Sequence, residues 1–420
     1  MDAEATALEN YDRSWTYREL DKAVEQRAVD LHSGGVTRGC VVPLVVRQDA
    51  ESVIDLLAHW RAGATPAPLN SRLRLAEREA ALSALAGIEA SAAQVVLWTS
   101  GTGGQPRGVA ISIEALQANA RASAERLELS REDTWLVSLS PAHVGGLVLI
   151  TRSLLLGSRL LACGPFNAER VNQRLSEITH ISLVPTQLSR ILELRNGQPP
   201  PETFQCALVG GAQTPKGLLD RAVSTGWPIA LTYGLTELTS QVATAPPELT
   251  RKKPGTVGAP LSGVEVRLDE RGEIQARGDT LASGYVGDYS ESLTDGEGWH
   301  WTGDLGSFDS DGHLWITGRR TDRIVTGGVT VDAAEVEEAL RSHPAVADAC
   351  VVGIPDEEWG ERVGAWVELA DEGPTRAVLD AHLRELLSSS KIPRSYHFGT
   401  PVPRNANGKL DRTTVRQVLS

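Results

Sequence analysis

Cysteine is scarce in this 420-residue chain, and the four cysteines lie far apart. Cys40, Cys163, Cys206 and Cys350 form no C-x-x-C pair. They therefore offer neither a disulfide framework nor a zinc site, and they suit a reducing compartment. Basic residues are outnumbered, with 41 Lys and Arg against 54 Asp and Glu. The net charge of −13 argues against general binding to nucleic acid or anionic membranes, because both need a basic surface.

A long hydrophobic run is also missing. Arg152 and Arg159 interrupt the most apolar region, residues 145–162, which is too short and too charged to span a bilayer. The acidic start, MDAEATALENYDRSW, has no apolar signal-peptide core. We therefore expect a cytoplasmic protein without stable membrane insertion. A hydrophobic content of 41% suffices for a large core, and the length suggests two or three domains of ~150 residues.

The first part of the chain alternates between strand-like and helix-like segments. Residues 15–36 have helical spacing, Thr16 and Glu19 form a capping-box pattern, and residues 52–64 predict a second helix. The expected strands are CVVPLVV (40–46), AQVVLWTS (93–100), TWLVSLS (134–140), HISLVPT (180–186), QCALVGG (205–211) and IALTYG (229–234). This alternation predicts an α/β domain whose ligands bind at the carboxyl ends of the strands.

The pattern changes after residue 255. Short alternating strands with glycine turns predict a small β unit that continues through residues 298–320. A helix at 331–343, strands ACVVGIP and GAWVELA, and a helix AVLDAHLRELLSSS follow. We therefore expect two domains, 1–318 and 319–420, of which the second is a small α+β unit.

The sequence LWTSGTGGQPRGVAIS (97–112) suggests a phosphate-binding loop. It matches neither G-x-x-x-x-G-K-[ST], because Val109 and Ala110 follow Gly108, nor G-x-G-x-x-G, because Pro106 takes the third glycine position. Glycines permit close backbone approach, and hydroxyl groups, backbone N–H groups and Arg107 can bind an anion. The alternative is a mobile surface turn.

Three further windows carry polar groups suited to a nucleotide. In TYGLTE (232–237), Thr236 can donate to a phosphate and Glu237 can bind Mg²⁺; a solvated loop glutamate is the alternative. In WHWTGDLG (299–306) and GRRTDR (318–323), Asp304 can accept from ribose hydroxyls and Arg319 can donate, unless they form an Asx turn and a surface cluster. In NANGKLDR (405–412), a tight turn presents Lys409, which could also be a solvated charge.

In this order and spacing, the four windows resemble the acyl-adenylate-forming superfamily of acyl-CoA synthetases, luciferases and peptide-synthetase adenylation domains. The resemblance runs from WTYRELD to NGKLDR. The family's phosphate loop is roughly TSGTTGxPKG, and here Gly103 and Arg107 replace a Thr and a Lys. Three windows are similar to the o-succinylbenzoate–CoA ligases of menaquinone biosynthesis: SPAHVGGLVLITRSLLLGSRL, THISLVPTQLSRIL and YGLTELTSQVAT.

The resemblance implies an α/β fold with helix-flanked sheets, a β-barrel-like unit and a mobile C-terminal lid. It also implies a two-step reaction. A carboxylic acid attacks the α-phosphorus of ATP and releases pyrophosphate, and a CoA thiol then displaces AMP to form a thioester. ATP, Mg²⁺ and coenzyme A would be required, and the acid would be aromatic, with 2-succinylbenzoate as the first candidate. The chain could also form a homodimer.

The family motifs assign residue roles by position. Lys409 would bridge the acyl carboxylate and the α-phosphate, Glu237 would hold Mg²⁺, and His143 would lie beside the acid. Phosphates would contact Thr99, Ser100, Gly101, Thr102, Gly103, Gly104, Arg107 and Thr236. Adenine would contact Gly210, Gly211, Ala212, Tyr233 and Gly234, ribose Asp304 and Arg319, and pantetheine Gly328. Thr239, Ser240 and Gln241 would face the acid.

Some assignments stay open. His143 could instead be a packed core histidine, and Arg152 is a candidate partner for a second substrate carboxylate. Thr321 matches the hinge position, where many relatives have Asp or Lys, and Ala333 replaces a family proline. Rival interpretations are an enzyme that loads another aryl or fatty acid onto CoA or a carrier protein, an amino-acid adenylation domain, a non-enzymatic nucleotide-binding relative and an α/β protein with turn-rich loops. Amino-acid enzymes hold an Asp where His143 stands, which disfavours that rival.

Overall fold

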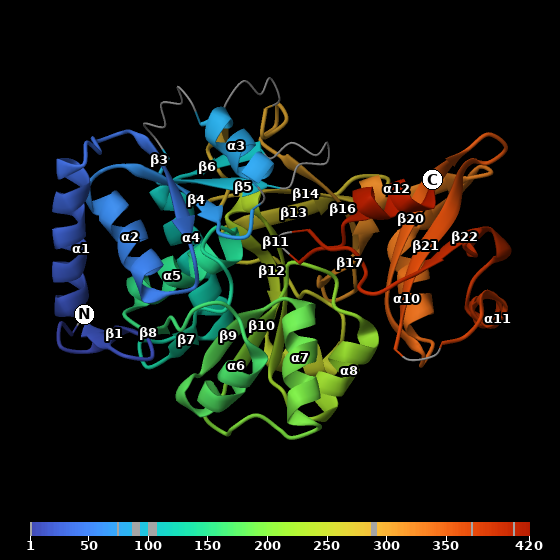
Figure 1. The fold of residues 1–420 in the computed structure, drawn as a ribbon, viewed down its shortest axis with the longest axis horizontal. Helices are drawn as coiled ribbons and strands as arrows, with labels where there is room; N and C mark the ends of the chain where they lie inside the picture. The colour runs from blue at the N-terminus through green and yellow to red at the C-terminus, as the bar shows by residue number, and fades with distance from the viewer. Residues whose placement is uncertain are drawn as a thin grey trace.

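The computed structural model describes residues 2–73, 75–85, 93–99, 107–286, 292–370, 373–405 and 408–420. The chain forms a large N-terminal part and a smaller C-terminal part that lie side by side (Figure 1). The N-terminus is at the far end of the large part and the C-terminus is in the small one. Among the described residues, no helix has the length and apolar character that a membrane crossing requires.

The large part is built on an eight-stranded sheet with the order β12-β11-β10-β9-β7-β8-β1-β2. Its strands are β1 (Thr6–Glu9), β2 (Ser14–Thr16), β7 (Thr134–Leu136), β8 (Arg159–Leu161), β9 (His180–Leu183), β10 (Cys206–Val209), β11 (Ile229–Leu235) and β12 (Ser240–Ala245). The inner strands are parallel, and β2 and β12 pair antiparallel at the two edges. The carboxyl ends of β9, β10 and β11 therefore meet along one edge.

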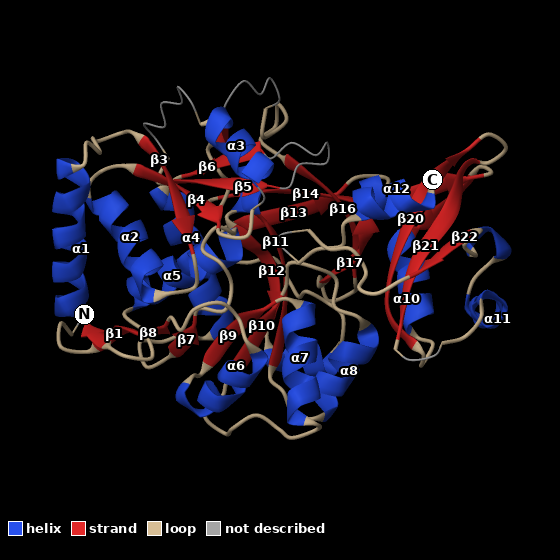
Figure 2. Ribbon diagram, in the orientation of Figure 1, coloured by secondary structure: helices blue, strands red, loops and turns tan. Residues whose placement is uncertain are grey.

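Helices cover both faces of this sheet (Figure 2). One face packs on α1 (Tyr17–Ser33), α2 (Ala50–Arg61), α4 (Ile113–Leu127) and α5 (Val144–Leu156). The other packs on α6 (Ala168–Arg174), η1 (Leu175–Glu177), α7 (Pro185–Arg195), α8 (Lys216–Ser224) and α9 (Pro247–Lys252). Neighbouring residues alternate between the two cores, as Trp135 and Leu136 do, because successive strand side chains point to opposite faces.

Smaller sheets flank the large one. β3 (Val41–Val46) pairs with β4 (Thr65–Asn70), and β5 (Val95–Thr99) joins β6 (Arg107–Ile111) and β15 (Gly284–Val286); α3 (Leu75–Ala84) lies between β4 and β5 in the chain. η2 (Thr236–Leu238) links β11 to β12. The expected β unit after residue 255 is a four-stranded sheet of β13 (Val264–Leu268), β14 (Glu273–Gly278), β16 (His300–Phe308) and β17 (Leu314–Arg319).

The C-terminal part is an α+β unit. Its five-stranded sheet contains β18 (Arg323–Thr326), β19 (Val329–Asp332), β20 (Val346–Asp356), β21 (Gly360–Leu369) and β22 (Ser395–Phe398). Its helices are η3 (Arg320–Asp322), α10 (Ala333–Arg341), α11 (Arg376–Leu386), η4 (Ser389–Lys391) and α12 (Arg412–Leu419). The last strand of the four-stranded sheet thus ends at Arg319, and the first strand of this sheet begins at Arg323.

Two local expectations had different outcomes. The capping box is confirmed, because Thr16 Oγ1 accepts from Glu19 N at 3.2 Å and Thr16 N donates to Glu19 Oε2 at 2.8 Å. The placement of residues 93–100 in the strand–helix alternation is wrong. Strand β5 is followed by β6 and pairs with it antiparallel, because the segment after the loop is a second strand rather than a helix.

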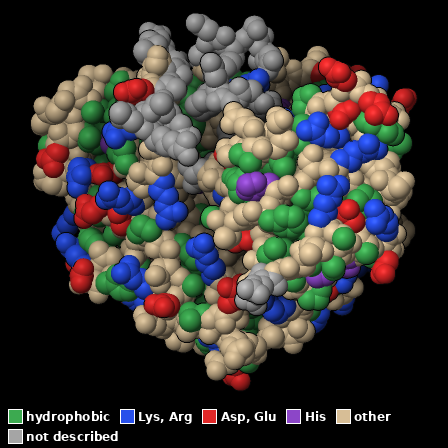
Figure 3. Space-filling view, turned by 45° about the vertical axis from the view of Figure 1, so that its right-hand side comes forward, with side chains coloured by type: hydrophobic (Ala, Val, Ile, Leu, Met, Phe, Trp, Pro, Cys, Tyr) green, Lys and Arg blue, Asp and Glu red, His purple; other side chains and the backbone are tan. Residues whose placement is uncertain are grey.

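Acidic and basic side chains are interspersed on the face shown in Figure 3. Among the described residues on that face, Lys and Arg form no continuous basic stripe.

Candidate active site

The backbone around Gly210 and Gly234 approaches so closely that only glycine fits. A Cβ on Gly234 would lie 1.7 Å from Ser240 O, where the pairing of β11 with β12 is irregular. A Cβ on Gly210 would lie 2.6 Å from Thr232 Cγ2. The two glycines thus allow close packing of the chain at the carboxyl ends of β10 and β11, next to Tyr233.

The proposed ribose-binding residues meet at this edge. Tyr233 Oη donates to Asp304 Oδ2 at 2.8 Å, and Arg319 Nε lies 3.5 Å from Asp304 Oδ1. Asp304 and Arg319 are directly opposite each other in the β16–β17 pairing. Burial raises the pKa of Asp304, although Arg319 and Tyr233 act in the opposite direction. The carboxylate is therefore held by one hydrogen bond and one ion pair from neighbouring elements.

Lys409 precedes α12 in the C-terminal part, and its side chain lies close enough to this cluster to interact electrostatically with Asp304 and Arg319. Burial in the cleft, and then the charge of Arg319, lower the pKa of Lys409, whereas Asp304 and Glu237 raise it. Lys409 nevertheless remains exposed to solvent. The tertiary structure thus brings the predicted lysine to the predicted ribose residues.

The turn that carries Lys409 is held by its neighbours. Lys409 N donates to Asn405 Oδ1 at 3.1 Å, and Asn405 N donates to Lys409 O at 2.8 Å. Arg404 Nη1 donates to Gly408 O at 2.7 Å, and Arg404 also pairs with Asp348. These bonds hold the backbone of the turn in place relative to the C-terminal sheet.

Glu237 and Arg107 share a neighbour, Tyr285, that sequence reasoning missed. Tyr285 Oη donates to Glu237 Oε1 at 3.3 Å, and the Arg107 guanidinium lies 5.6 Å from the Tyr285 ring centre. Burial raises the pKa of Tyr285 to about 12. Oε2 of Glu237 makes no hydrogen bond within the described part of the chain. One free carboxylate oxygen fits Mg²⁺, which usually takes one or two protein carboxylates together with waters and phosphates.

His143 lies close enough to Lys409 for the lysine charge to affect its pKa. It also contacts Asn70, a second residue that sequence reasoning missed. His143 Nε2 is 3.1 Å from Asn70 Nδ2. Burial, and then the charge of Lys409, lower the pKa of His143 to about 4. Asn70 ends β4, so the rule that polar strand ends are site candidates would have found it. That strand was not predicted, because the prolines in ATPAPLN are more typical of a loop than of a strand.

Gln241 and Arg152 form a buried polar pair between α5 and β12. Arg152 Nη1 donates to Gln241 Oε1 at 3.0 Å, and the Arg152 guanidinium lies 4.2 Å from the centre of the Trp135 ring. Arg152 is only 1% exposed, and burial lowers its pKa to about 10. Among the described residues, no carboxylate lies within ion-pair distance of it. Ser240, the neighbour of Gln241, adopts a left-handed φ of 88°.

The remaining residues that the family motifs assign to the site lie in several separate places. Ser100, Gly101, Thr102, Gly103 and Gly104 lie outside the described residues. Thr99 and Arg107, at the ends of this loop, are paired across β5 and β6. Gly211, with a φ of 80°, and Ala212 are exposed after β10, and Thr236 starts η2. Gly328 lies in the β18–β19 turn, where an added Cβ would meet nothing within 4 Å, so it is apart from the groups around Lys409.

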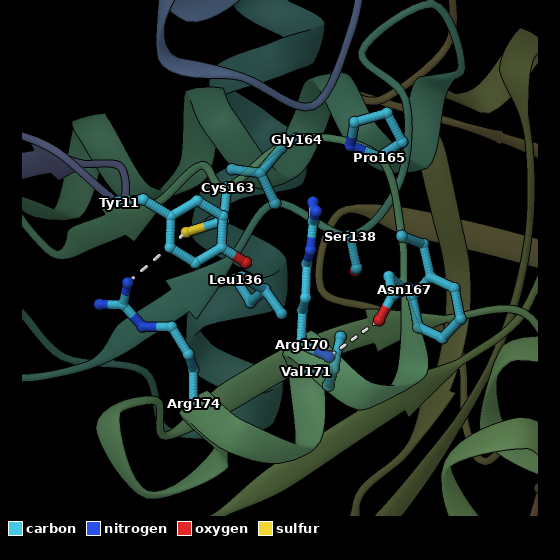
Figure 4. Close-up of a pocket in the computed structure, with 12 residues that line it drawn as sticks. Tyr11, Leu136, Ser138, Cys163, Gly164, Pro165, Asn167, Arg170, Val171 and Arg174 are labelled. Atoms are coloured by element: carbon cyan, nitrogen blue, oxygen red, sulfur yellow. Dashed lines mark hydrogen bonds between the residues drawn. The ribbon is translucent and has the colours of Figure 1, made fainter.

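Two other polar groupings do not belong to this site. A small pocket at the carboxyl ends of β7 and β8 is lined by Tyr11, Cys163 and Arg170, and by none of the assigned residues (Figure 4). Asp309, Asp311 and His313 cluster as metal ligands do. Lys253 Nζ, however, lies 2.8 Å from Asp309 Oδ2 and also contacts the other two side chains. The ammonium group takes the position that a cation would need.

Comparison with known proteins gives the same overall picture. The AMP-binding enzyme family matches residues 1–90 and 86–286, and the AMP-binding enzyme C-terminal domain matches residues 335–409. The 2-succinylbenzoate–CoA ligase of Bacillus cereus is 32% identical over 461 positions, covering 99% of this chain and 95% of the relative. The enzyme of that name from Bacillus licheniformis is 32% identical, covering 96% and 94%.

Comparison with solved structures agrees with the comparison of sequences. The o-succinylbenzoate CoA synthetase of Bacillus subtilis in complex with the acyl-adenylate OSB-AMP superimposes with a TM-score of 0.92 at 30% identity, covering 99% of this chain and 96% of that one. The same enzyme with ATP and magnesium ion gives a TM-score of 0.91 at 30% identity, covering 100% and 97%. The resemblance drawn from the four motifs is thus confirmed, and the chain belongs to the AMP-binding enzyme family.

Proposed function

We propose that the protein is an AMP-forming acid–CoA ligase that converts 2-succinylbenzoate first to its acyl-adenylate and then to its CoA thioester. The observation that carries this proposal is the approach of Lys409 to Asp304, Arg319, Glu237 and His143. These groups come from both parts of the chain, and their charges interact with that of Lys409. The full-length similarity to ligases named for this substrate supports the choice of acid.

Charge neutralisation and positioning account for the first half-reaction. The acid carboxylate and the α-phosphate are both negative, so their approach requires positive charge placed beforehand. Lys409 supplies it between the two groups, and the nearby Arg319 adds to it. Asp304 accepts from the ribose hydroxyls, and Tyr233 contacts the base. Mg²⁺ held by Glu237 would offset charge on the phosphates of bound ATP.

The second half-reaction requires the C-terminal part to move. We assign residues 1–318 to an ATP- and acid-binding domain and 319–420 to a lid, with a pivot at Thr321. The residues on either side of Thr321 support this division. Arg320 Nε lies 3.2 Å from Glu273 Oε2 in the large domain, whereas Asp322 Oδ2 accepts from Arg412 Nε at 2.9 Å in the lid. Rotation at Thr321 would withdraw Lys409 and admit the CoA thiol, with Gly328 near the pantetheine.

Arg152 and Gln241 are the proposed partners of a second substrate carboxylate. A buried cation without an ionic partner is costly, and an anionic ligand offsets that cost. Arg152 lies about two and a half turns, roughly 14 Å, further along α5 than His143. That separation, shortened by the long arginine side chain, suits an aromatic acid with a charged group at each end. Ser240 lies beside Gln241 and would complete the polar wall.

The direct test is incubation with ATP, Mg²⁺, CoA and 2-succinylbenzoate, followed by mass detection of AMP and the thioester. Benzoate, a fatty acid and a set of amino acids form the comparison panel. Preferred activation of another aryl or fatty acid would favour the alternative ligase, and activation of amino acids alone would refute the acid–CoA ligase. We place the protein in the cytoplasm, and sedimentation will test whether it is a homodimer.

A further inference from the structure

Asn70 has a fixed side-chain orientation because its carboxamide closes a turn. Asn70 ends β4, and the chain turns immediately, with Leu73 N donating to Asn70 O at 3.1 Å. Within this turn Arg72 N donates to Asn70 Oδ1 at 3.0 Å. A backbone N–H can only donate, so the side-chain atom that it meets must be the carbonyl oxygen. The NH₂ group of Asn70 therefore points the other way, toward His143.

This orientation determines which nitrogen of His143 carries the proton. Asn70 Nδ2 lies 3.1 Å from His143 Nε2, and an amide NH₂ group can donate but not accept. Nε2 must then be the unprotonated nitrogen of the ring. In a neutral imidazole the single proton is on the other nitrogen, Nδ1. Burial and the neighbouring Lys409 lower the pKa of His143 to about 4, so the ring is neutral near pH 7.

The rest of the histidine is fixed by its own helix. His143 caps the start of α5, and its carbonyl accepts from Gly146 N and Leu147 N, each at 3.0 Å. Among the described residues, Asn70 is the only hydrogen-bond partner of the ring. The backbone and one ring nitrogen are thus held, and the Nδ1–H group is available to a ligand.

We propose that Asn70 is a positioning residue that holds His143 in its Nδ1–H form, so that the ring presents a hydrogen-bond donor to the acid substrate. With Nε2 occupied, His143 cannot accept a proton there, and it acts as a donor to a substrate oxygen. The direction of the Nδ1–H group toward the acid rests on the proposed function. The tautomer itself does not, because it follows from contacts within the chain.

A second Asx turn shows that the turn alone does not need this contact. Asn10 Oδ1 accepts from Asp12 N at 2.9 Å and from Arg13 N at 2.8 Å. Asn10 therefore makes the same kind of turn, and among the described residues no histidine is hydrogen-bonded to its side chain. The Asn10→Asp variant is a matched control for Asn70→Asp, because aspartate keeps the oxygen that both turns require.

The decisive measurement is ¹⁵N NMR of the full chain labelled at its nine histidines, with His143→Gln used to assign one signal pair. We expect Nδ1 to be protonated and Nε2 unprotonated at pH 7. In Asn70→Asp a carboxylate faces Nε2, so that nitrogen should become protonated, whereas Asn10→Asp should leave the signals unchanged. A wild-type ring protonated at Nε2, or at both nitrogens, would overturn the proposal.

Kinetics then separate positioning from a general loss of structure. Asn70→Asp should raise KM for the acid about tenfold, the effect of one lost hydrogen bond, with little change in KM for ATP. Equal increases in both KM values would contradict a role through His143. The NMR result needs no substrate. If no acid is activated but the Nδ1–H form is observed, the proposed function fails and the tautomer assignment stands.

Discussion

Replacing Gly318 with alanine should slow the first half-reaction and spare the second. Gly318 lies on β17 in the N-terminal part, directly against Asp332, which caps the start of α10 in the C-terminal part. A Cβ added at Gly318 would be 2.2 Å from Asp332 Oδ2. Under the proposed rotation at Thr321, the clash exists only in the arrangement of this structure, in which the charge of Lys409 acts on Asp304. Gly318 is not in the left-handed region, so alanine causes no backbone strain.

The size of the expected slowing depends on what it costs Asp332 to avoid the new methyl group. Its Oδ1 accepts from Ala334 N at 2.9 Å and thereby caps α10. Moving the side chain would forfeit that cap, which is worth ~1 kcal/mol, and tolerating the overlap costs ~1–3 kcal/mol. The arrangement with Lys409 in the cleft would thus be disfavoured by about 1–3 kcal/mol. That corresponds to a roughly 5–150-fold slower adenylation.

Two assays measure the half-reactions separately. Pyrophosphate release from ATP and acid reports adenylation, and thioester formation from supplied acyl-AMP and CoA reports the second step. Gly296→Ala is the matched control, since a Cβ there meets nothing within 4 Å. In Gly318→Ala/Asp332→Ala the obstructing side chain is gone, and adenylation should partly recover.

The reasoning would be refuted by equal loss of both steps in Gly318→Ala. That result would mean that the substitution damages the fold rather than one arrangement of the lid. Unchanged adenylation would be equally damaging, because it would show that the contact between Gly318 and Asp332 does not limit the arrangement that carries out the chemistry.

Further predictions concern single charges. Lys409→Ala should slow adenylation about a thousandfold, while thioester formation from supplied acyl-AMP survives. The factor corresponds to ~4 kcal/mol, the interaction energy of two charges 4 Å apart near a protein surface. Equal loss of both steps would contradict the role of Lys409. Arg152→Met should raise KM for 2-succinylbenzoate but not for benzoate, by roughly tenfold or more, and a parallel rise for both acids would exclude a carboxylate contact. Because the pKa of Lys409 is lowered, kcat/KM for the acid should fall with rising pH at a lower pH than an ordinary lysine would give. Burial also lowers the pKa of His180 to about 4, so the folded state binds fewer protons than the unfolded state between about pH 4 and pH 6.5. The free energy of unfolding should therefore decrease as pH falls from about 6.5, and thermal unfolding of His180→Gln should show a weaker dependence.

Local features were predictable because short-range rules govern them. Thr16 and Glu19 cap α1 through contacts three residues apart, and the alternation of strands and helices identified the sheet core. The same rules failed at residues 93–100, where a strand pairs with its immediate successor. They also overlooked the strand that ends at Asn70, because its prolines resemble a loop signal.

The sequence by itself determined the chemical groups of the candidate site and their order along the chain. A lysine in a tight turn, an aspartate after Thr-Gly and a glutamate after a strand can each be read locally, and together they indicate the family. The tertiary structure alone decided which groups come together: Asn70 with His143, Arg152 with Gln241, and Lys409 near enough to Asp304 for their charges to interact. These pairs join elements far apart in the chain. Their contacts depend on sheet order, domain placement and side-chain orientation, which periodicity and motif spacing do not encode.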